Sequence, residues 1–564
     1  MQFNLQNGSM KTRRKNNLKS IFSIVLTFIL IIGCSSDMKQ KEYPYEYLYS
    51  DLMFEMEKIV PPVFPNNKLN IKDFGAISDG ETLNTQVFAD AIEELSKKGG
   101  GTLIVPSGVW YTGPIVFKSN INLHLEKGAL ILFSSNFDLY PLIETSFEGL
   151  NTRRCQSPIS GNGLENIAIT GEGSINGSGQ DWRPLKRDKV SDRFWKQKIE
   201  SGGAILNNNM WFPTEGAKRG YVMSDMNVPM VDLTEDEWLD IKGFLRPVMV
   251  SFINCKNILL EGVLFENSPA WNIHPLMCEN LIVDNISVRN PGFSQNGDGL
   301  DVESCKNVII VNSSFDVGDD AICIKSGKNE AGRRRGIPTS NVLIDNCKVF
   351  QGHGGFVVGS EMSGGANNIV VSNCQFMGTD VGLRFKSTRG RGGVVENIYI
   401  KNINMFDIAT EAFLFDLFYG GKSAVEALED GDVVNVELID IPAVDETTPV
   451  FRNIYVEDLV CRNARRAMHF NGLPEMNIEN INVKNVSITA EIGAELSESK
   501  DVLFQNVNIT PREGAAFILK NVTNFKGENL GYPEQLKQVV EISGEKSDNI
   551  KLPDSIDSKK IIKK

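Results

Sequence analysis

Three aspartates and a histidine stand at spacings that could bring them together on a repeating structure. Asp298 lies one repeat before the adjacent pair Asp319 and Asp320, and His353 lies one repeat after that pair. Carboxyl groups that are held close together cannot all stay ionised, because each negative charge raises the proton affinity of the others. Such a cluster can hydrolyse a glycosidic bond, since a protonated carboxyl can donate to the leaving oxygen while an ionised one activates water. For Asp319 and Asp320 alone, ordinary turn chemistry is the alternative.

A repeated segment must position these residues. It reads Asn, branched apolar residue, any residue, apolar residue, and it recurs at spacings from 23 residues (Asn257 to Asn280) to 56 residues (Asn397 to Asn453). Short alternating strands, frequent Asn and Gly and little helical periodicity predict an all-β fold, a single-stranded, right-handed parallel β-helix. We interpret the repeated Asn residues as an internal side-chain ladder. The long spacings indicate loops inserted between strands.

A second set of strands fixes the register of the candidate site. In these strands four inward apolar pairs can be aligned: Leu300/Val302, Ile322/Ile324, Phe356/Val358 and Leu383/Phe385. In this alignment Asp298 and Asp320 share a column on successive coils, and Asp319 and His353 share the column one residue earlier. We therefore expect the three carboxylates and the imidazole to lie on one outer face of the solenoid, within about 15 Å for three coils.

Cations are expected on the same face. Side chains alternate along a strand, so Arg384 should point outward, with Lys325 and Lys386 two positions further on in their strands. The whole sequence has a net charge of −13, which argues against nucleic acid as a partner. From Arg289 to Arg391, however, twelve Lys and Arg residues face ten Asp and Glu residues. This local excess predicts an anionic ligand, such as a substrate that bears carboxylates.

Four short motifs follow one another in this region: Asn296-Gly297-Asp298-Gly299, Gly318-Asp319-Asp320, Gly352-His353-Gly354 and Arg384-Phe385-Lys386. Together they resemble the motifs of polygalacturonases of glycoside hydrolase family 28, and the resemblance covers about residues 66–510. The family commonly has Thr at position 297 and a branched aliphatic residue at position 385. Both are spectator positions, so neither departure affects the expected chemistry.

The resemblance implies a pectin lyase-like solenoid that hydrolyses α-1,4-galacturonosyl linkages of polygalacturonate by single displacement with inversion. It implies that Asp319 is the general acid, that Asp298 and Asp320 position and deprotonate water, and that His353 tunes the ionisation of the acid. The implied partner is a galacturonate-containing polysaccharide or oligosaccharide, and we expect no cofactor and no catalytic metal. The residues that we assign to substrate binding are Asn296, Lys325, Arg384 and Lys386.

Two glycine-bounded segments, at residues 332–336 and 359–365, resemble loops of the exo-acting branch, where added loops close one end of the cleft. We therefore expect release of monogalacturonate from a non-reducing end. Endo-action stays open, as do rhamnogalacturonan and xylogalacturonan as substrates. One rival is a calcium-dependent pectate lyase, which the order of His353, Arg384 and Lys386 disfavours. The other is a non-catalytic adhesin or glycan-binding β-helix, which would not need three stacked carboxylates.

The N-terminal residues predict export. Five basic residues precede an apolar run from Ile21 to Ile32, which is short for a membrane span and typical of a signal peptide. The run ends in Ile31-Ile32-Gly33-Cys34, which resembles the lipobox of bacterial lipoproteins. We expect residues 1–33 to be a signal peptide and residues 34–65 a tether. A lipid on Cys34, as the sole membrane attachment, would hold the protein at the outer membrane.

The remaining organisation follows from composition. We expect a catalytic solenoid over residues 66–545, a helix over residues 85–98 that covers its first coil, and a tail over residues 546–564. An insertion at residues 179–247 contains four of the six tryptophans, whose indoles could stack on sugar or fix loops: Trp182, Trp195, Trp211 and Trp238. The nine cysteines contain no CxxC pair, so we expect no structural metal site and favour packed free thiols over a disulfide bond.

Overall fold

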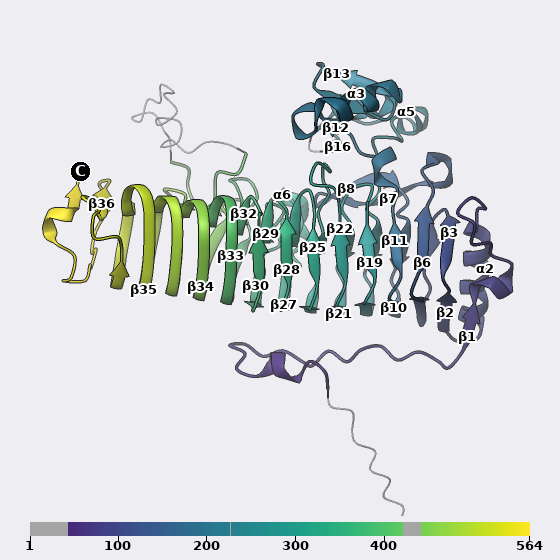
Figure 1. Ribbon diagram of the computed structural model, residues 1–564, viewed down its shortest axis with the longest axis horizontal. Coiled ribbons are helices and arrows are strands. Elements are labelled where there is room, and N and C mark those ends of the chain that lie inside the picture. Colours follow the sequence, from purple (N-terminus) through teal and green to yellow (C-terminus); the bar gives the residue numbers. More distant parts are fainter. Residues whose placement is uncertain (1–42, 226, 421–440) are drawn as a thin grey trace, which may run out of the picture. The chain divides into compact units, whose positions relative to one another are not determined.

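The computed structural model describes residues 43–225, 227–420 and 441–564; the predicted signal peptide and Cys34 lie outside these ranges. The chain divides into two units. In the described part of the first, residues 43–55 contain the short 3-10 helix η1 (Glu46–Tyr49). The second, residues 56–564, contains the solenoid (Figure 1). No helix among the described residues combines the length and the apolar character that a membrane crossing requires.

Each central coil contributes three short strands, and each strand pairs in parallel with its equivalent in the next coil. The first face, which carries the candidate site, consists of β4 (Ile115–Val116), β9 (Ile159–Asn162), β17 (Val250–Ile253), β20 (Ile273–Leu276), β23 (Leu300–Glu303), β26 (Asp320–Lys325), β29 (Gly354–Val358) and β32 (Val381–Lys386). The second consists of β1 (Lys68–Asn70), β2 (Gly101–Val105), β5 (Ile121–Leu125), β10 (Glu165–Gly171), β18 (Lys256–Glu261), β21 (Glu279–Asp284), β24 (Lys306–Val311), β27 (Thr339–Asp345) and β30 (Ala366–Ser372). The third consists of β3 (Gly108–Thr112), β6 (Ala129–Phe133), β11 (Ser174–Asn176), β19 (Leu264–Glu266), β22 (Ser287–Arg289), β25 (Ser314–Asp316), β28 (Lys348–Gln351) and β31 (Gln375–Met377). The predicted parallel β-helix is confirmed.

Towards the C-terminus the coils become continuous ribbons: β33 (Val394–Asp416), β34 (Val450–Asn471) and β35 (Ile478–Gly531), followed by β36 (Val540–Ser543) and β37 (Ile561–Lys563). Strand β37 pairs in parallel with β36, and Ile556 is 6% exposed in the core. We predicted a tail over residues 546–564, and the structure instead continues the solenoid there. The reason is that apolar residues of this segment cover the open end of the last coil, where unpaired strand edges would otherwise be exposed.

The repeated Asn residues form the predicted ladder along the second face. The side-chain amide of Asn280 donates to Asn257 at 3.0 Å, and that of Asn307 donates to Asn280 at 3.2 Å. The same bond recurs from coil to coil as far as Asn480, which donates to Asn453 at 2.7 Å. These ladder residues are left-handed, with φ of 58° at Asn257 and 54° at Asn480. Asn tolerates this conformation better than most residues, which explains its recurrence at the corner.

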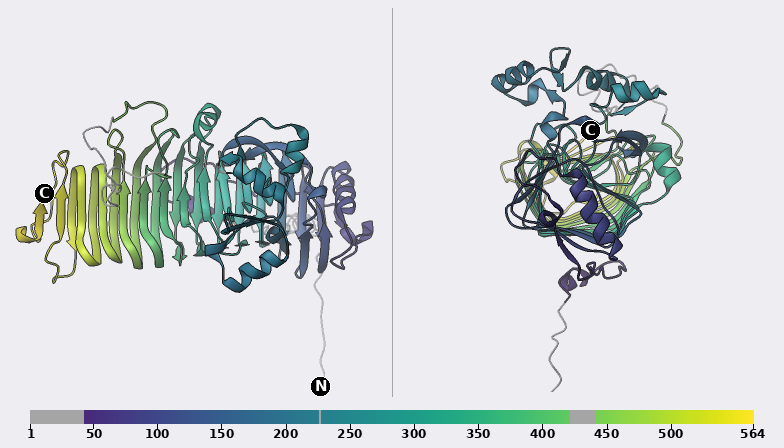
Figure 2. Two further views of the ribbon diagram at one scale, coloured as in Figure 1. Left: turned by 90° about the horizontal axis from the view of Figure 1, so that it is seen from above. Right: turned by 90° about the vertical axis from the view of Figure 1, so that its right-hand side faces the viewer.

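One apolar core runs through the coils and is capped at its N-terminal end. The cap is α2 (Thr85–Lys97), whose residues Phe88, Ala91, Ile92 and Leu95 are buried against the first coils. Figure 2 shows this helix across the end of the solenoid when it is viewed along its axis. The eight cysteines among the described residues are buried and free, which confirms the prediction of packed thiols for them.

The insertion is a small layer of its own on one side of the coils (Figure 1). It contains α3 (Asp192–Glu200), α4 (Glu215–Val222), α5 (Glu235–Asp240) and the short antiparallel strands β12 (Leu185–Lys186), β13 (Ala204–Leu206), β14 (Met210–Phe212), β15 (Ser224–Asp225) and β16 (Val228–Pro229). Trp182, Trp195 and Trp211 are 1%, 7% and 4% exposed and belong to local apolar clusters. A segment this long needs its own core, so these three indoles stabilise the insertion and are not available to stack on sugar.

An antiparallel hairpin precedes the insertion, and the sequence pattern did not predict it. It joins β7 (Leu142–Phe147) to β8 (Leu150–Cys155) through Glu148 and Gly149, both with positive φ. Two central residues of this conformation suit a tight hairpin, and Gly is favoured in such turns. This β7–β8 hairpin extends from the coils that precede the candidate site.

Candidate active site

The register of the first face agrees with the sequence alignment. Leu300 pairs with Ile322, Ile322 pairs with Phe356, and Phe356 pairs with Leu383. Asp298 and Asp320 therefore lie at equivalent positions on successive coils, just before their strands continue into the apolar pairs. Since Asp320 pairs with Gly354, the preceding residues Asp319 and His353 are equivalent as well.

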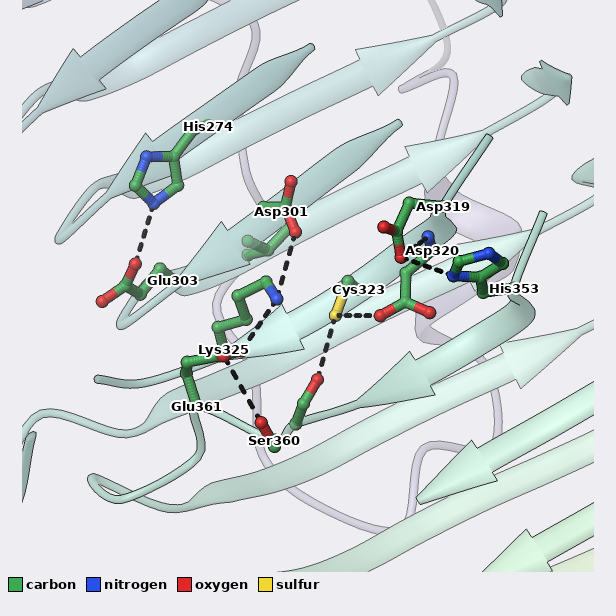
Figure 3. A network of polar contacts seen from close by, with 12 residues as sticks. His274, Asp301, Glu303, Asp319, Asp320, Cys323, Lys325, His353, Ser360 and Glu361 are labelled. Atoms are coloured by element: carbon green, nitrogen blue, oxygen red, sulfur yellow. Dashed lines mark hydrogen bonds and ion pairs between the residues drawn. The ribbon is translucent and has the colours of Figure 1, made fainter. Parts of the chain in front are cut away.

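The predicted carboxylate cluster is formed. One side-chain oxygen of each of Asp298, Asp319 and Asp320 lies within 4.8 Å of the others. Asp298 and Asp320 are only 3% and 1% exposed, while Asp319 retains more contact with solvent. The imidazole Nδ1 of His353 lies 3.0 Å from Asp319 Oδ1. The four residues that we predicted to be catalytic thus form one group (Figure 3 shows all of them except Asp298 with labels).

Two cations compensate the charge of this group. The Lys386 ammonium donates to Asp320 Oδ2 at 2.7 Å, and Arg384 Nη1 donates to Asp320 Oδ1 at 3.1 Å. The Nε of Arg384 is buried and has no hydrogen-bond partner among the described residues. The ring of Tyr419 lies 5.0 Å from the Lys386 ammonium and 5.8 Å from the Arg384 guanidinium, and the sequence patterns did not identify it.

The three carboxyls differ in proton affinity. Burial, and then the charge of Asp319, raise the pKa of Asp298 well above its ordinary value. Burial also opposes the ionisation of Asp320, but the charges of Lys386, Arg384 and Lys325 outweigh it and hold the pKa of Asp320 below its ordinary value. For Asp319 the hydrogen bond and charge of His353 outweigh burial and lower its pKa. The same hydrogen bond raises the pKa of His353. These directions favour the protonated form of Asp298, the ionised form of Asp319 and the protonated form of His353.

A second polar network lies next to the cluster on the same face (Figure 3). The Lys325 ammonium lies 2.9 Å from Glu361 and 3.5 Å from Asp301, and Lys325 is only 3% exposed. Its ammonium also lies 4.6 Å from the ring of Trp271. We predicted Lys325 as a substrate-binding cation. The structure places it beside two carboxylates, which strand alternation alone could not predict, and a contact of Lys325 with substrate stays a prediction.

Asn296, which we assigned to substrate binding, is hydrogen-bonded to a buried arginine. Its side-chain oxygen accepts a hydrogen bond of 2.8 Å from Arg246 Nη2. Arg246 is 2% exposed and also donates to the backbone oxygens of Pro269 and Gln295. This buried guanidinium fixes the turn that leads into Asp298. A direct contact of Asn296 with substrate stays a prediction.

The cluster could also be considered as a cation site, because three carboxylate oxygens lie close together. The donor set argues against that use. Lys386 and Arg384 already contact both oxygens of Asp320, and His353 contacts Asp319. A divalent cation would have to displace these contacts or share the site with three positive groups, at a high electrostatic cost.

Three segments converge at one side of the catalytic face. The predicted loop at residues 332–336 is the end of helix α6 (Asn329–Arg335), which stops at the left-handed residue Gly336. The backbone of Gly149, at the tip of the β7–β8 hairpin, accepts a hydrogen bond from Lys328 N at 3.3 Å. Residues 359–365 join them, since Ser363 N donates to Gly327 O at 2.9 Å.

The hairpin also reaches the coil immediately before Asp298. Phe147 packs on Trp271, with ring centroids 4.7 Å apart, and both residues are buried. Asn272 N, next to Trp271 in the chain, donates to Asp298 O at 3.0 Å. The hairpin, α6 and residues 359–365 therefore form a wall beside the catalytic face, at the carboxyl ends of β26 and β29.

Comparison with known proteins agrees with this geometry. The family model described as Glycosyl hydrolases family 28 matches residues 237–457. The solved structure of a hyperthermoactive exopolygalacturonase from Thermotoga maritima is 33% identical with a TM-score of 0.61, and the match covers 77% of this chain and 89% of that one. The chain belongs to glycosyl hydrolases family 28. This family 28 chain is also 28% identical to a probable polygalacturonase of Vitis vinifera over 429 residues, 74% of each protein. An endo-polygalacturonase of Pectobacterium carotovorum subsp. carotovorum is 24% identical over 329 residues, 58% of this chain and 70% of that one.

Membership of family 28 makes this chain a glycoside hydrolase, and the cluster supplies the groups that this chemistry needs. An ionised carboxylate, Asp320, and proton carriers at Asp298 and at the Asp319–His353 pair lie on one rigid face. The carboxyl oxygens are closer together than the ~6.5–9.5 Å separation that is usual between the two carboxyls of inverting glycosidases. Inversion therefore does not follow from the spacing and is implied by the family resemblance alone.

Proposed function

We propose that the protein hydrolyses α-1,4-galacturonosyl linkages of polygalacturonate from the non-reducing end and releases monogalacturonate. The observation that carries this proposal is the juxtaposition of three carboxylates with Arg384 and Lys386 on one face. The carboxylates supply acid and base, and the cations suit a sugar that bears a carboxylate of its own. The three relatives compared with this chain are all polygalacturonases by name.

The charges suggest how the proton reaches the leaving oxygen. Asp319 and His353 share one proton across a contact of 3.0 Å, so the pair can present it at Asp319 when the glycosidic oxygen begins to accumulate charge. Asp320 stays ionised beside its two cations and can accept a proton from water. Asp298 is adjacent to both and can hold that water. In this mechanism Asp319 is the acid, as the family resemblance implies.

The raised pKa of Asp298 provides the competing assignment, in which Asp298 is the acid. A substrate with an activated leaving group, such as nitrophenyl α-galacturonide, separates the two, because its departure needs no proton. We expect Asp319→Asn to lose about 10²–10⁴-fold activity on digalacturonate and to regain most of it on the activated substrate. Asp298→Asn should be impaired on both substrates. The opposite pattern would assign the acid to Asp298.

Two observations support exo-action. The hairpin, α6 and residues 359–365 are joined into a wall beside the catalytic face, and we take this wall to block a longer non-reducing end. The Thermotoga maritima exopolygalacturonase is the more similar of the exo- and endo-acting relatives described above. Digestion of de-esterified polygalacturonate in excess chelator, with product sizes and ultraviolet absorbance followed over time, tests this proposal. Saturated monomer from the outset is expected. Saturated oligomers would indicate endo-action, and unsaturated products that form only after calcium is restored would indicate a lyase.

We further propose that the protein is exported and held at the outer membrane by a lipid on Cys34. The basic and apolar residues before Cys34 support this proposal. Metabolic labelling with a radioactive fatty acid should mark the chain, and Cys34→Ala should abolish the label and release the protein in soluble form. Retention of the label in that variant would refute lipidation at this position.

A further inference from the structure

A cavity lies beside the catalytic face, between the β7–β8 hairpin and helix α6. Its volume is about 540 Å³, which falls in the range of small-molecule sites. Leu276, at the end of β20, contributes to its apolar floor, and Ser146 and Asn151 of the hairpin contribute polar groups. Its lining also includes charged side chains, Glu144 of the hairpin and Arg334 and Arg335 of α6. The mechanism described above uses none of these residues.

This hairpin–α6 cavity is separate from the carboxylate cluster. Leu276 pairs with Glu303, which lies five residues after Asp298 on the same coil. At about 3.3 Å per residue, the cavity floor lies roughly 16 Å from the cluster along the strand direction. Two buried residues lie between the cavity and the carboxylate cluster. Glu303 is 0% and His274 is 1% exposed, and their side chains are hydrogen-bonded to each other at 2.8 Å (Figure 3). Arg335 Nη1 contacts the other oxygen of Glu303 at 2.6 Å and closes this barrier on the side of the cavity.

The wall of the cavity contains a buried hydroxyl that has no hydrogen-bond partner among the described residues. Ser146 is only 8% exposed, and its hydroxyl has no hydrogen-bond partner within the part of the chain that the structure describes. An unsatisfied buried hydroxyl is costly, and a ligand that bonds to it recovers that cost. Ser146 lies on the strand that lines the cavity, next to the side-chain amide of Asn151 on the paired strand.

The charges of the cavity lining differ in their partners: Glu144 lies 3.5 Å from Arg153, outside the lining, whereas the two arginines lie on α6. Arg335 is paired with Glu303, but the Arg334 side chain is 76% exposed, and its ion pair with Glu330 is a contact of 3.7 Å between two exposed groups. Such exposed pairs contribute little, so a ligand carboxylate can replace Glu330 as the partner of Arg334. A uronate sugar matches the rest of the lining, because its C–H face can lie on Leu276 while its hydroxyls meet Ser146 and Asn151.

We propose that the hairpin–α6 cavity is a second binding site for a uronate residue, which holds the polysaccharide next to the catalytic face without taking part in hydrolysis. The choice of uronate rests on the proposed function. A second anchoring point raises the effective concentration of polymer at the catalytic face, so it should matter for long substrates.

Calorimetric titration of the full chain carrying Asp319→Asn with saturated digalacturonate tests the proposal. We expect two binding sites. Adding Arg334→Glu, or Ala331→Trp to fill the cavity, should remove one of them, whereas Arg193→Glu, an exposed charge reversal in α3, should leave both. A neutral digalactose should not occupy the cavity. In the otherwise native enzyme, Arg334→Glu should raise the KM for polygalacturonate about two- to fivefold, as expected for the loss of one exposed charge pair.

A single site in the parent, or two sites that survive both cavity variants, would overturn the inference. Hydrolysis of polygalacturonate by the native enzyme is measured alongside. If that hydrolysis is absent while the second site binds, the proposed function fails and the cavity assignment stands. If hydrolysis occurs with one binding site only, the cavity assignment fails and the proposed function stands.

Discussion

Replacing Lys386 with Met should destabilise the protein in a way that depends on pH. Lys386 and Asp320 are 5% and 1% exposed and 2.7 Å apart, so the substitution leaves a buried carboxylate with one fewer counter-ion. Removal of one partner from a buried pair costs about 3–5 kcal/mol, and we expect about 3 kcal/mol at pH 7 because Arg384 still contacts Asp320 at 3.1 Å. Urea unfolding, followed by circular dichroism, measures the loss.

The direction of the pH dependence follows from Asp320. Its pKa in the folded protein lies below the ordinary value, so its stabilising contribution is present above the unfolded pKa, about 3.9, and is lost as pH falls through the folded value. Without Lys386 the folded pKa of Asp320 rises, and the carboxyl can take up a proton at mildly acidic pH. The difference in the free energy of unfolding between variant and parent should therefore be largest near neutral pH and should narrow as pH falls.

A double variant separates this pair effect from lost packing. Asp320→Asn combined with Lys386→Met removes both charges, so the double variant should be less destabilised than the sum of the single variants by more than about 0.5 kcal/mol. Lys401→Met is the control, because Lys401 is 62% exposed and its contact with Glu457 is 3.9 Å; it should change stability by less than about 0.5 kcal/mol at any pH. Additive losses, or a loss from Lys386→Met that does not vary with pH, would refute the reasoning.

Three further predictions concern the reaction and the wall. The alkaline limb of the pH profile of kcat/KM should lie above pH 6.5, because activity needs the proton of the Asp319–His353 pair and the pKa of His353 is raised. His353→Gln should lower kcat about 10–100-fold and remove that limb, and a limb that stays in place would show that another group sets it. Proton NMR of the first product formed from an α-linked substrate should show the β-anomer, as inversion requires; an initial α-anomer would instead agree with the short carboxylate spacing. Gly149→Ala should cost about 1–3 kcal/mol and let longer saturated products appear, because φ is +72° there and a Cβ would stand 2.6 Å from Lys328 N. Gly163→Ala, at φ +65° with no atom within 4 Å of the added Cβ, is its matched control, and equal product patterns in both variants would contradict the role of the hairpin tip.

The sequence predicted what the repeat itself determines. Alternation along the strands placed Leu300, Ile322 and Phe356 in one inward column, and the register of the catalytic residues followed from that alignment. The Asn ladder could be predicted for the same reason, since each coil repeats one local pattern. These features depend on residues near one another in the chain or on a constant step between coils.

Contacts that break the repeat could not be predicted. The pairing of Lys325 with Glu361 depends on the path of residues 359–365, and no periodicity describes that path. The sequence could not show whether the tryptophans of the insertion stack on sugar or form a hydrophobic core within the insertion. The Glu148-Gly149 turn between two alternating segments was the one available signal for the hairpin. The distribution of protons among the carboxyls depends on burial and on distances of a few ångströms, which a sequence does not contain.

The Asn ladder has a consequence for how this enzyme can change. Neighbouring ladder residues bond to each other whether 23 or 56 positions separate them in the chain, as in Asn257 with Asn280 and Asn397 with Asn453. The stacking of coils is therefore indifferent to the length of the excursions between rungs. Inserted segments such as the β7–β8 hairpin and α6 are therefore exchangeable. Recombination could shorten, replace or add such segments while the Asn residues of the ladder keep their pairing. Enzymes built in this way can gain or lose loops that block one end of the substrate-binding face, while the strands that carry the catalytic residues stay unchanged.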